Sequence, residues 1–184
     1  RNEIVEEWGG TAFSTVEEMI NVGVDAVTIA TPTVTHLDVA APLLAKGIAC
    51  LIEKPLAPTA DIASVIADAA EEGSAVLQVG HVVRYDPVMQ AIASIENLRP
   101  RFIEMTRISP MTFRSTDVGV VLDMMIHDLD LLTMLIGQEP AEIYANAVSV
   151  MGEAEARADS LKALNHAAPF LRRELGKRLR LRNT

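Results

Sequence analysis

Three short apolar runs that alternate with helix-length segments are the feature that most limits how this chain can fold. The runs lie at residues 25–30, 48–52 and 75–79. β-prone runs separated by single helices of about 10 to 15 residues predict parallel strands joined by right-handed crossovers. The first 80 residues are therefore predicted to form a Rossmann-type, doubly wound parallel sheet of the α/β class.

Capping and spacing signals place the helices between these runs. A capping box at Ser14-Thr15-Val16-Glu17 predicts a helix over about 15–22, and a second helix is predicted over about 34–46. A third helix follows the proline-punctuated loop at residues 55–58. The face that this third helix turns to the core is predicted to consist of Ile62, Val65, Ile66 and Ala69.

Beyond residue 80 the pattern changes, and residues 81–152 are interpreted as the beginning of an α+β substrate domain. The predicted elements are a helix from Asp86 and Pro87 to about residue 96, a strand over 101–108, a long apolar helix over about 118–136 and a strand over 141–150.

Charge separates an acidic body from a basic end. The net charge is −9, yet half of the 16 Lys and Arg residues lie in residues 157–184, where only Asp159 and Glu174 are acidic. An acidic body repels nucleic acid. Any RNA contact is therefore expected only through residues 153–184, interpreted as a basic helical tail.

Membrane insertion and secretion are not expected. No apolar run reaches the roughly 18–20 residues that cross a bilayer, and the start, Arg1-Asn2-Glu3-Ile4, does not resemble a signal peptide. Cys50 is the only cysteine, which excludes an intramolecular disulfide. These features predict a cytoplasmic protein.

Parallel sheets of this kind bind ligands outside the carboxyl ends of their strands. The residues there are Thr31-Pro32, Glu53-Lys54-Pro55 and Gly80-His81. The Lys54 ammonium could donate a hydrogen bond to a hydroxyl or carbonyl oxygen of a ligand, and Pro55 would fix the direction of its loop. The alternative is a surface lysine paired with Glu53 in an ordinary turn.

Gly119, Asp123 and His127 are each one turn apart on the predicted long helix and share one stripe. A carboxylate beside an imidazole favours the charged ring and can orient it, which suits a general base. Two alternatives stay open: a packed Asp–His pair, or a divalent metal site. Two ligands without a third are thin support for a metal, and none is predicted.

Three further side chains are weaker candidates for ligand contact. His36 begins the second predicted helix, and Arg84 and Tyr85 follow the third strand. Helix capping by His36 and simple surface exposure of the other two would explain them equally well.

In combination, these residues resemble the Gfo/Idh/MocA oxidoreductase family, which includes glucose–fructose oxidoreductase and inositol dehydrogenase. The matching motifs are, in chain order, Ala30-Thr31-Pro32 with His36, Glu53-Lys54-Pro55, Arg84-Tyr85-Asp86-Pro87 and the Gly119/Asp123/His127 stripe. The resemblance covers about residues 1–152 and is closest to the UDP-N-acetylglucosamine 3-dehydrogenase branch.

The resemblance implies oxidation of a hydroxyl of a sugar, sugar nucleotide or cyclitol by hydride transfer, with NAD or NADP as cofactor. By this analogy His127 takes the hydroxyl proton, Asp123 orients His127 or holds an adjacent hydroxyl, and Lys54 donates to the reacting oxygen. The implied cofactor-binding residues are Thr31, Pro32, His36, Glu53, Lys54 and Pro55. The implied substrate-binding residues are His81, Arg84, Tyr85, Gly119, Asp123 and His127. A homo-oligomer is expected for the intact protein.

The chain also departs from this family. It has no Gly-x-Gly-x-x-Gly loop, so residues 1–80 are expected to lack the first βαβ unit. Most of the large second sheet of the family is also expected to be absent, so both domains are expected to be truncated. Residues 160–184 resemble a fragment of ribosome-binding factor A, and the alternative is a generic basic amphipathic helix. A spliced or misassembled reading frame would explain both truncations and the step in charge. Two other hypotheses stay open: a non-catalytic homologue that binds a sugar or a partner, and association of the tail with RNA or the ribosome.

Overall fold

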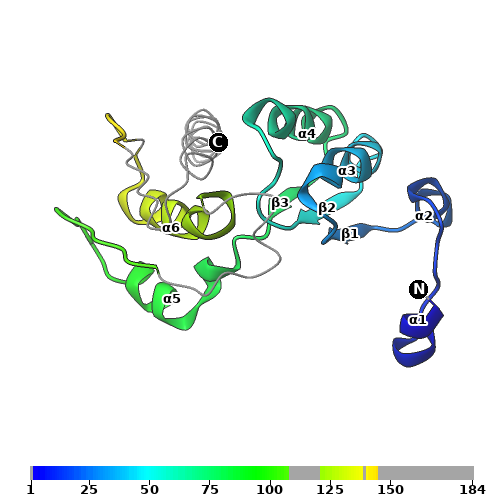
Figure 1. The fold of residues 1–184 in the computed structure, drawn as a ribbon, viewed down its shortest axis with the longest axis horizontal. Coiled ribbons are helices and arrows are strands. Elements are labelled where there is room, and N and C mark those ends of the chain that lie inside the picture. The colour runs from blue at the N-terminus through cyan, green and yellow to red at the C-terminus, as the bar shows by residue number, and fades with distance from the viewer. Residues whose placement is uncertain (1, 108–120, 139, 145–184) are drawn as a thin grey trace, which may run out of the picture.

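The computed structural model describes residues 2–107, 121–138 and 140–144. Figure 1 shows the β-strands near the middle of the molecule, with helices α5 and α6 on one side and α2 on the other. The elements are α1 (Asn2–Trp8), α2 (Val16–Val22), β1 (Ala26–Ile29), the 3₁₀ turn η1 (Thr33–Thr35), α3 (His36–Leu44), β2 (Ala49–Ile52), α4 (Ala60–Glu72), β3 (Leu77–Val79), the 3₁₀ turn η2 (Val82–Tyr85), α5 (Pro87–Ala93), the π-helical turn η4 (Val121–Met125) and α6 (Ile126–Ile136).

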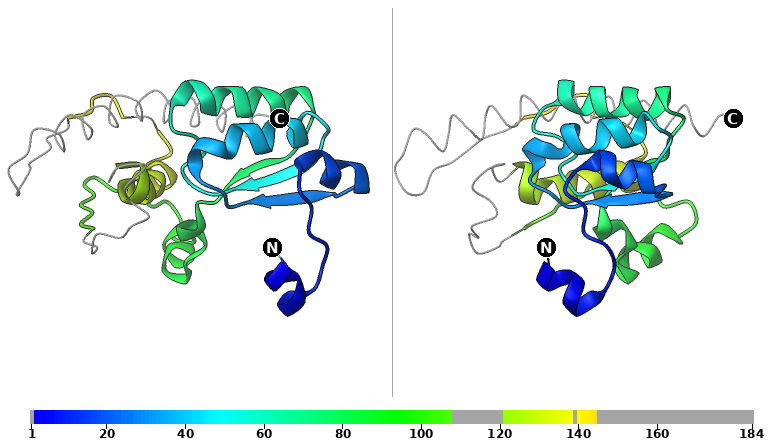
Figure 2. Two further views of the ribbon diagram at one scale, coloured as in Figure 1. Left: turned by 45° about the vertical axis from the view of Figure 1, so that its right-hand side comes forward. Right: turned by 90° about the vertical axis from the view of Figure 1, so that its right-hand side faces the viewer.

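The three strands form one parallel sheet in the order β1-β2-β3. Cys50 lies at the centre of the register, opposite Val27 on β1 and Leu77 on β3. Helices α3 and α4, which make the two crossovers, cover the same face of this sheet (Figure 2). The predicted Rossmann-type parallel sheet is therefore confirmed, although each strand is one to two residues shorter than its apolar run.

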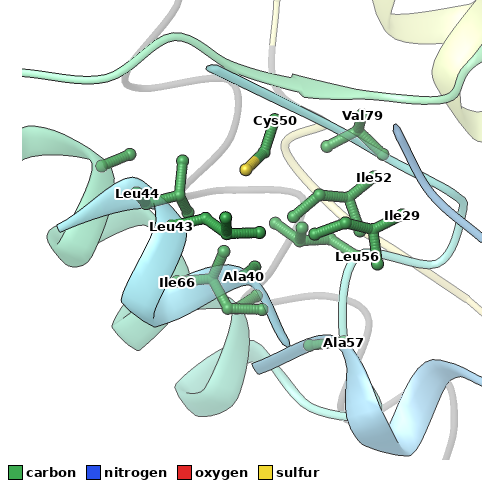
Figure 3. Close-up of a cluster of buried hydrophobic side chains, with 12 residues drawn as sticks. Ile29, Ala40, Leu43, Leu44, Cys50, Ile52, Leu56, Ala57, Ile66 and Val79 are labelled. Atoms are coloured by element: carbon green, nitrogen blue, oxygen red, sulfur yellow. The ribbon is translucent and has the colours of Figure 1, made fainter. Parts of the chain in front are cut away.

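The core lies between the sheet and these two helices. Every second strand residue points into it, and the buried cluster includes Ile29, Cys50, Ile52, Val79, Leu43, Leu44, Leu56 and Ile66 (Figure 3). The alternate residues Thr28, Leu51 and Gln78 are exposed on the opposite face. This period of two explains why such short strands are specified, because a slip of one residue would expose the whole core set.

The face of helix α4 that was predicted to pack on the core is confirmed except at Val65. Ala63, Ile66 and Ala70 are buried, whereas Val65 is 51% exposed. The helix packs on α3 and contributes to the same buried cluster as the strands, and the small alanines allow α3 to approach closely. Of the predicted face, Ile66 is fully buried and Ile62 and Ala69 are partly buried against the core, so Val65 alone was misassigned.

Gly73, directly after α4, is required by this close packing. A Cβ at this position would lie 1.8 Å from the carbonyl oxygen of Leu44 at the end of α3. No rotamer change relieves a clash with a backbone atom, so the two helix ends can meet in this way only around a glycine.

The capping box of α2 is shifted by one residue from the prediction. Thr15 is the N-cap, and its hydroxyl accepts a hydrogen bond of 3.2 Å from the Glu18 N–H. The Glu18 carboxylate in turn accepts from the Ser14 N–H at 2.6 Å. Two adjacent hydroxyl residues precede two adjacent glutamates, so two registers are possible, and the one with Thr15 forms.

The strand predicted over 101–108 is wrong for residues 101–107, which form no regular element, and residue 108 lies outside the described residues. The strand predicted over 141–150 is absent from residues 141–144, and its remainder also lies outside them. A strand needs a hydrogen-bonding neighbour, and among the described residues only β1, β2 and β3 pair.

The predicted helix over 118–136 is divided. Its described part consists of the π turn η4 followed by α6, and α6 ends at Gly137 as expected, where φ is +68°. Within the described ranges, no helix is both long and apolar enough to cross a bilayer.

We expect Ile66→Ala to lower the free energy of unfolding by about 2–5 kcal/mol, because Ile66 is fully buried. Val65→Ala, the adjacent residue on the same helix, should change it by no more than about 0.5 kcal/mol. Urea denaturation of both variants of the 184-residue chain measures the difference. Equal losses would mean that α4 is rotated relative to the described packing.

Candidate functional site

The carboxyl ends of the three strands lie side by side at one edge of the sheet. Strand-like hydrogen bonds continue there: the Glu53 N–H donates to the Ile29 carbonyl at 2.9 Å, and the Gly80 N–H donates to the Ile52 carbonyl at 2.7 Å. The structure thus brings together the three predicted post-strand segments, which begin at Thr31, Glu53 and Gly80.

The buried side chain of His36 links two of these segments. Its ring is 1% exposed, with Nδ1 3.1 Å from the Leu56 carbonyl oxygen and Nε2 3.0 Å from the Thr31 carbonyl oxygen. His36 therefore connects the backbone at Thr31 with the loop that follows Lys54. Its predicted contact with a cofactor stays a prediction, because both ring nitrogens face backbone carbonyls.

The remaining predicted cofactor residues differ in exposure. Thr31, Pro32 and Glu53 are exposed at the sheet edge, whereas Pro55, joined to Lys54 by a cis peptide bond, is buried. The first three are therefore accessible to a ligand, and Pro55 shapes the loop beneath them.

Lys54 extends from this edge to the second part of the chain. Its Nζ donates hydrogen bonds of 2.7 Å to the backbone carbonyl of Asp123 and 2.8 Å to the Asp123 Oδ1. The two side chains are only 19% and 21% exposed. The alternative of a lysine paired with Glu53 is wrong, because the Glu53 carboxylate accepts from the Lys54 backbone N–H instead.

The helix that carries the other two candidates has an irregular start. Asp123 lies in the π turn η4, and His127 lies in the first turn of α6. π turns disturb the regular hydrogen-bond ladder and occur often at functional sites. The ring of His127 is half-buried, and among the described residues its buried Nδ1 has no hydrogen-bond partner. Gly119, the third member of the predicted stripe, lies outside the described residues.

The charge state of His127 differs from the expectation. Burial lowers the pKa of the imidazole below its ordinary value of 6.5, and the nearby cations Lys54 and Arg107 lower it further. Asp128 and Asp130 act in the opposite direction but do not reverse the shift. The ring is therefore neutral at neutral pH, and a neutral imidazole has the lone pair that a general base needs.

Two carboxylates on α6 have roles that the sequence did not assign. Arg107 Nη2 donates to Asp128 Oδ1 at 2.6 Å, and its Nε donates to Asp128 Oδ2 at 2.9 Å. Hydrogen bonding to Asp128 raises the pKa of Arg107. The available signal was the presence of Asp128 and Asp130 in an otherwise apolar helix, since buried acids need partners.

The predicted substrate residues after β3 meet Asp130. Arg84 donates to both carboxylate oxygens of Asp130, from Nε to Oδ2 and from Nη2 to Oδ1. His81 Nδ1 lies 3.8 Å from Asp130 Oδ2, whereas Tyr85 is 66% exposed. Substrate contact by these three residues stays a prediction.

The described residues hold no cluster of three or more His, Cys, Asp or Glu side chains suited to a metal ion. The arrangement instead brings an ammonium, a carboxylate and a neutral imidazole to the ligand-binding edge of a parallel sheet. Groups of these kinds can transfer a proton in an enzyme of the oxidoreductase class, many members of which use a parallel dinucleotide-binding sheet of this type.

Comparison with known families agrees with this class. Residues 1–81 match the profile of an oxidoreductase family with an NAD-binding Rossmann fold, and residues 92–167 match the GFO/IDH/MocA C-terminal domain. The chain belongs to the Gfo/Idh/MocA oxidoreductase family.

Individual relatives extend this assignment. UDP-N-acetylglucosamine 3-dehydrogenase of Acidithiobacillus ferrooxidans is 36% identical over 97% of this chain and 59% of its own length. A solved structure of that enzyme superposes with a TM-score of 0.75 at 38% identity, covering 82% of this chain and 50% of the other. Inositol 2-dehydrogenase of Rhizobium meliloti is 32% identical over 71% of this chain and 42% of its own length.

The chain thus spans roughly half the length of these relatives. The suggested resemblance of residues 160–184 to ribosome-binding factor A is not supported. The C-terminal-domain profile of the family extends to residue 167, and the Acidithiobacillus enzyme aligns over 97% of the chain.

We expect Lys54→Met to raise the pKa of His127 toward 6.5, because the substitution removes a cation that disfavours the imidazolium. NMR titration of the histidine ring signals measures this pKa. Lys46→Met is the control, since exposed Lys46 precedes β2 whereas Lys54 follows its carboxyl end. An unchanged His127 pKa in Lys54→Met would show that the charge of Lys54 does not act on His127.

The same shift predicts a loss of stability in acid. The unfolded chain has the ordinary His127 pKa of 6.5 and binds the proton before the folded chain does. The contribution of His127 to the free energy of unfolding should therefore fall as the pH drops below about 6.5. In His127→Gln, denaturation curves between pH 7 and pH 5 should show a shallower decline, and an unchanged decline would contradict the shift.

Proposed function

We propose that this chain supplies the catalytic groups of an NAD(P)-dependent dehydrogenase that oxidises a hydroxyl of a sugar nucleotide. The observation that carries the proposal is the contact between Lys54 and Asp123, with His127 one turn further along the same helical segment. This contact joins the strand-end edge of the sheet to the helix that bears the base.

The exposed residues at that edge suit a nicotinamide cofactor. Thr31 offers a hydroxyl, Glu53 a carboxylate and Pro32 an apolar surface, which together can bind the hydroxyl groups and the ring of a nucleotide. These residues would hold NAD or NADP beside Lys54. When bound, the nicotinamide would accept the hydride released from the substrate carbon.

His127 would take the proton of the substrate hydroxyl. Its lowered pKa leaves it unprotonated at neutral pH, so a ring nitrogen can accept without first losing a proton. The half-buried setting also strengthens electrostatic interactions with an oxygen that becomes negative.

Lys54 would stabilise that oxygen. An ammonium has three N–H donors, and within the described residues two of them bond to Asp123. The third is available to the reacting oxygen, where a preorganised positive donor favours developing alkoxide charge. Asp123 would thus act by fixing the direction of Lys54.

The substrate class is proposed from the relatives. The Acidithiobacillus relative is a UDP-N-acetylglucosamine 3-dehydrogenase, and the Rhizobium relative is an inositol 2-dehydrogenase. The higher identity and wider coverage of the first favour UDP-N-acetylglucosamine over a cyclitol.

The test uses the 184-residue chain completed with the remaining segments of the Acidithiobacillus enzyme. We expect this chimera to form NADH or NADPH, followed at 340 nm, when UDP-N-acetylglucosamine is added. His127→Gln should lower kcat by about 10²- to 10⁴-fold, because it removes the general base. Lys54→Met should also lower kcat, and Lys46→Met should leave it unchanged.

Two results would contradict the proposal. Full turnover in His127→Gln would show that His127 is not the general base. Calorimetric binding of the sugar nucleotide to the chimera without any cofactor reduction would instead indicate a non-catalytic, sugar-binding homologue.

A further inference from the structure

Arg84 and Asp130 form an ionic link between η2, which directly follows the sheet, and α6. Arg84 belongs to η2 just beyond β3, and Asp130 lies in the second turn of α6. Arg84 makes a bidentate contact with the Asp130 carboxylate, and His81 Nδ1 lies 3.8 Å from the same carboxylate. The pair thus connects residues 46 positions apart.

This link is energetically significant because Asp130 is buried. Its side chain is 9% exposed, and that of Arg84 is 20% exposed. A buried carboxylate that loses its partner is strongly disfavoured, so α6 cannot move away from Arg84 without leaving an unpaired charge.

Asp130 lies on the same helix as the candidate base His127, so the link to Arg84 also affects the position of that base. Asp130 lies three residues after His127, on the neighbouring turn of the same helix. It is also seven residues after Asp123, a distance of about 10 Å along a helix axis. Arg107 also pairs with Asp128 on α6, but Arg107 lies in a segment without regular structure. Lys54 and Arg84 both follow strands of the sheet, so these two anchors, separated by about 10 Å, fix the helical segment relative to the sheet.

We propose that Asp130, held by Arg84, is a positioning residue that sets the rotation of α6 and thereby directs His127 toward Lys54. The inference deepens the proposed function, on which it rests for its catalytic consequence. Arg84 then acts through Asp130, and the contact of Arg84 with substrate becomes an outcome that the test distinguishes.

The first readout is the ionisation of His127, which needs no substrate and no activity. The charged groups around the ring are Lys54, Arg107, Asp128 and Asp130, with Asp123 on the preceding turn. If Asp130 acted only by its charge, Asp130→Asn would lower the His127 pKa further. If Asp130 positions α6, the ring becomes more hydrated and moves away from Lys54, and its pKa rises toward 6.5.

Asp128→Asn is the matched control, because Asp128 lies on the same helix and is also paired with an arginine. Its carboxylate favours the protonated ring by charge, so this variant should lower the His127 pKa. Opposite directions in Asp130→Asn and Asp128→Asn, measured by NMR titration, support the positioning role. A fall or no change in both variants overturns it.

Arg84→Lys covers the case in which Asp130→Asn does not fold. It keeps the positive charge but loses the two parallel hydrogen bonds. A cooperative urea unfolding transition confirms folding, and the His127 pKa should again rise, by less than in Asp130→Asn. An unchanged pKa in folded Arg84→Lys overturns the proposal.

Kinetics of the completed enzyme give the second readout. A misdirected base lowers kcat by about 10- to 100-fold with little change in the KM for the sugar nucleotide, in both Asp130→Asn and Arg84→Lys. A raised KM for the sugar nucleotide in Arg84→Lys alone, with the His127 pKa unchanged, would show that Arg84 contacts the substrate instead of positioning α6. If the parent enzyme is inactive, the proposed function fails, and the NMR comparison still decides whether Asp130 positions α6.

Discussion

The hydrogen bonds from Lys54 to Asp123 are the contact on which the candidate site depends. Two of the three ammonium protons are used at 2.7 and 2.8 Å, in a setting where both side chains are about one-fifth exposed. A partly buried ammonium needs acceptors, and the π turn supplies a backbone carbonyl and a carboxylate from one residue. The direction of the remaining proton is thereby fixed.

The sheet makes this contact possible. Alternation of buried and exposed residues along β1, β2 and β3 sets their register, and parallel pairing places all three carboxyl ends at one edge. His36 then joins the backbone at Thr31 to that at Leu56 beneath this edge. The buried core therefore supports the loop that carries Lys54, and the hydrogen bonds from Lys54 to Asp123 hold η4, the turn that leads into α6.

Local patterns in the sequence were sufficient for the sheet and for selecting Lys54, Asp123 and His127 as candidates, whose catalytic roles stay predictions. Apolar runs predict strands well because their length and their alternation of buried and exposed positions are local properties of the sequence. Lys54 could be selected because it follows one of these predicted strands. The buried face of α4 was misjudged at Val65, since packing on α3, a tertiary feature, decides which face is covered. The strand predicted near residue 101 lacks a described neighbour to pair with.

The electrostatics of the site depend on partners distant in the sequence. Asp128 pairs with Arg107 across 21 positions, and Asp130 pairs with Arg84 across 46. No helical period indicates such partners. The same distance explains the reversed pKa shift of His127: the spacing showed the nearby Asp123, whereas burial and the approach of Lys54 and Arg107 are products of the fold.

A double-mutant cycle on Lys54 and Asp123 tests the central contact most directly. The free energies of unfolding of Lys54→Met, Asp123→Ala and the double variant are measured by urea denaturation. A direct, half-buried pair predicts a coupling of at least about 1 kcal/mol between the two substitutions. Additivity within about 0.3 kcal/mol would show that the two groups do not interact, and the link between sheet and helix would be lost.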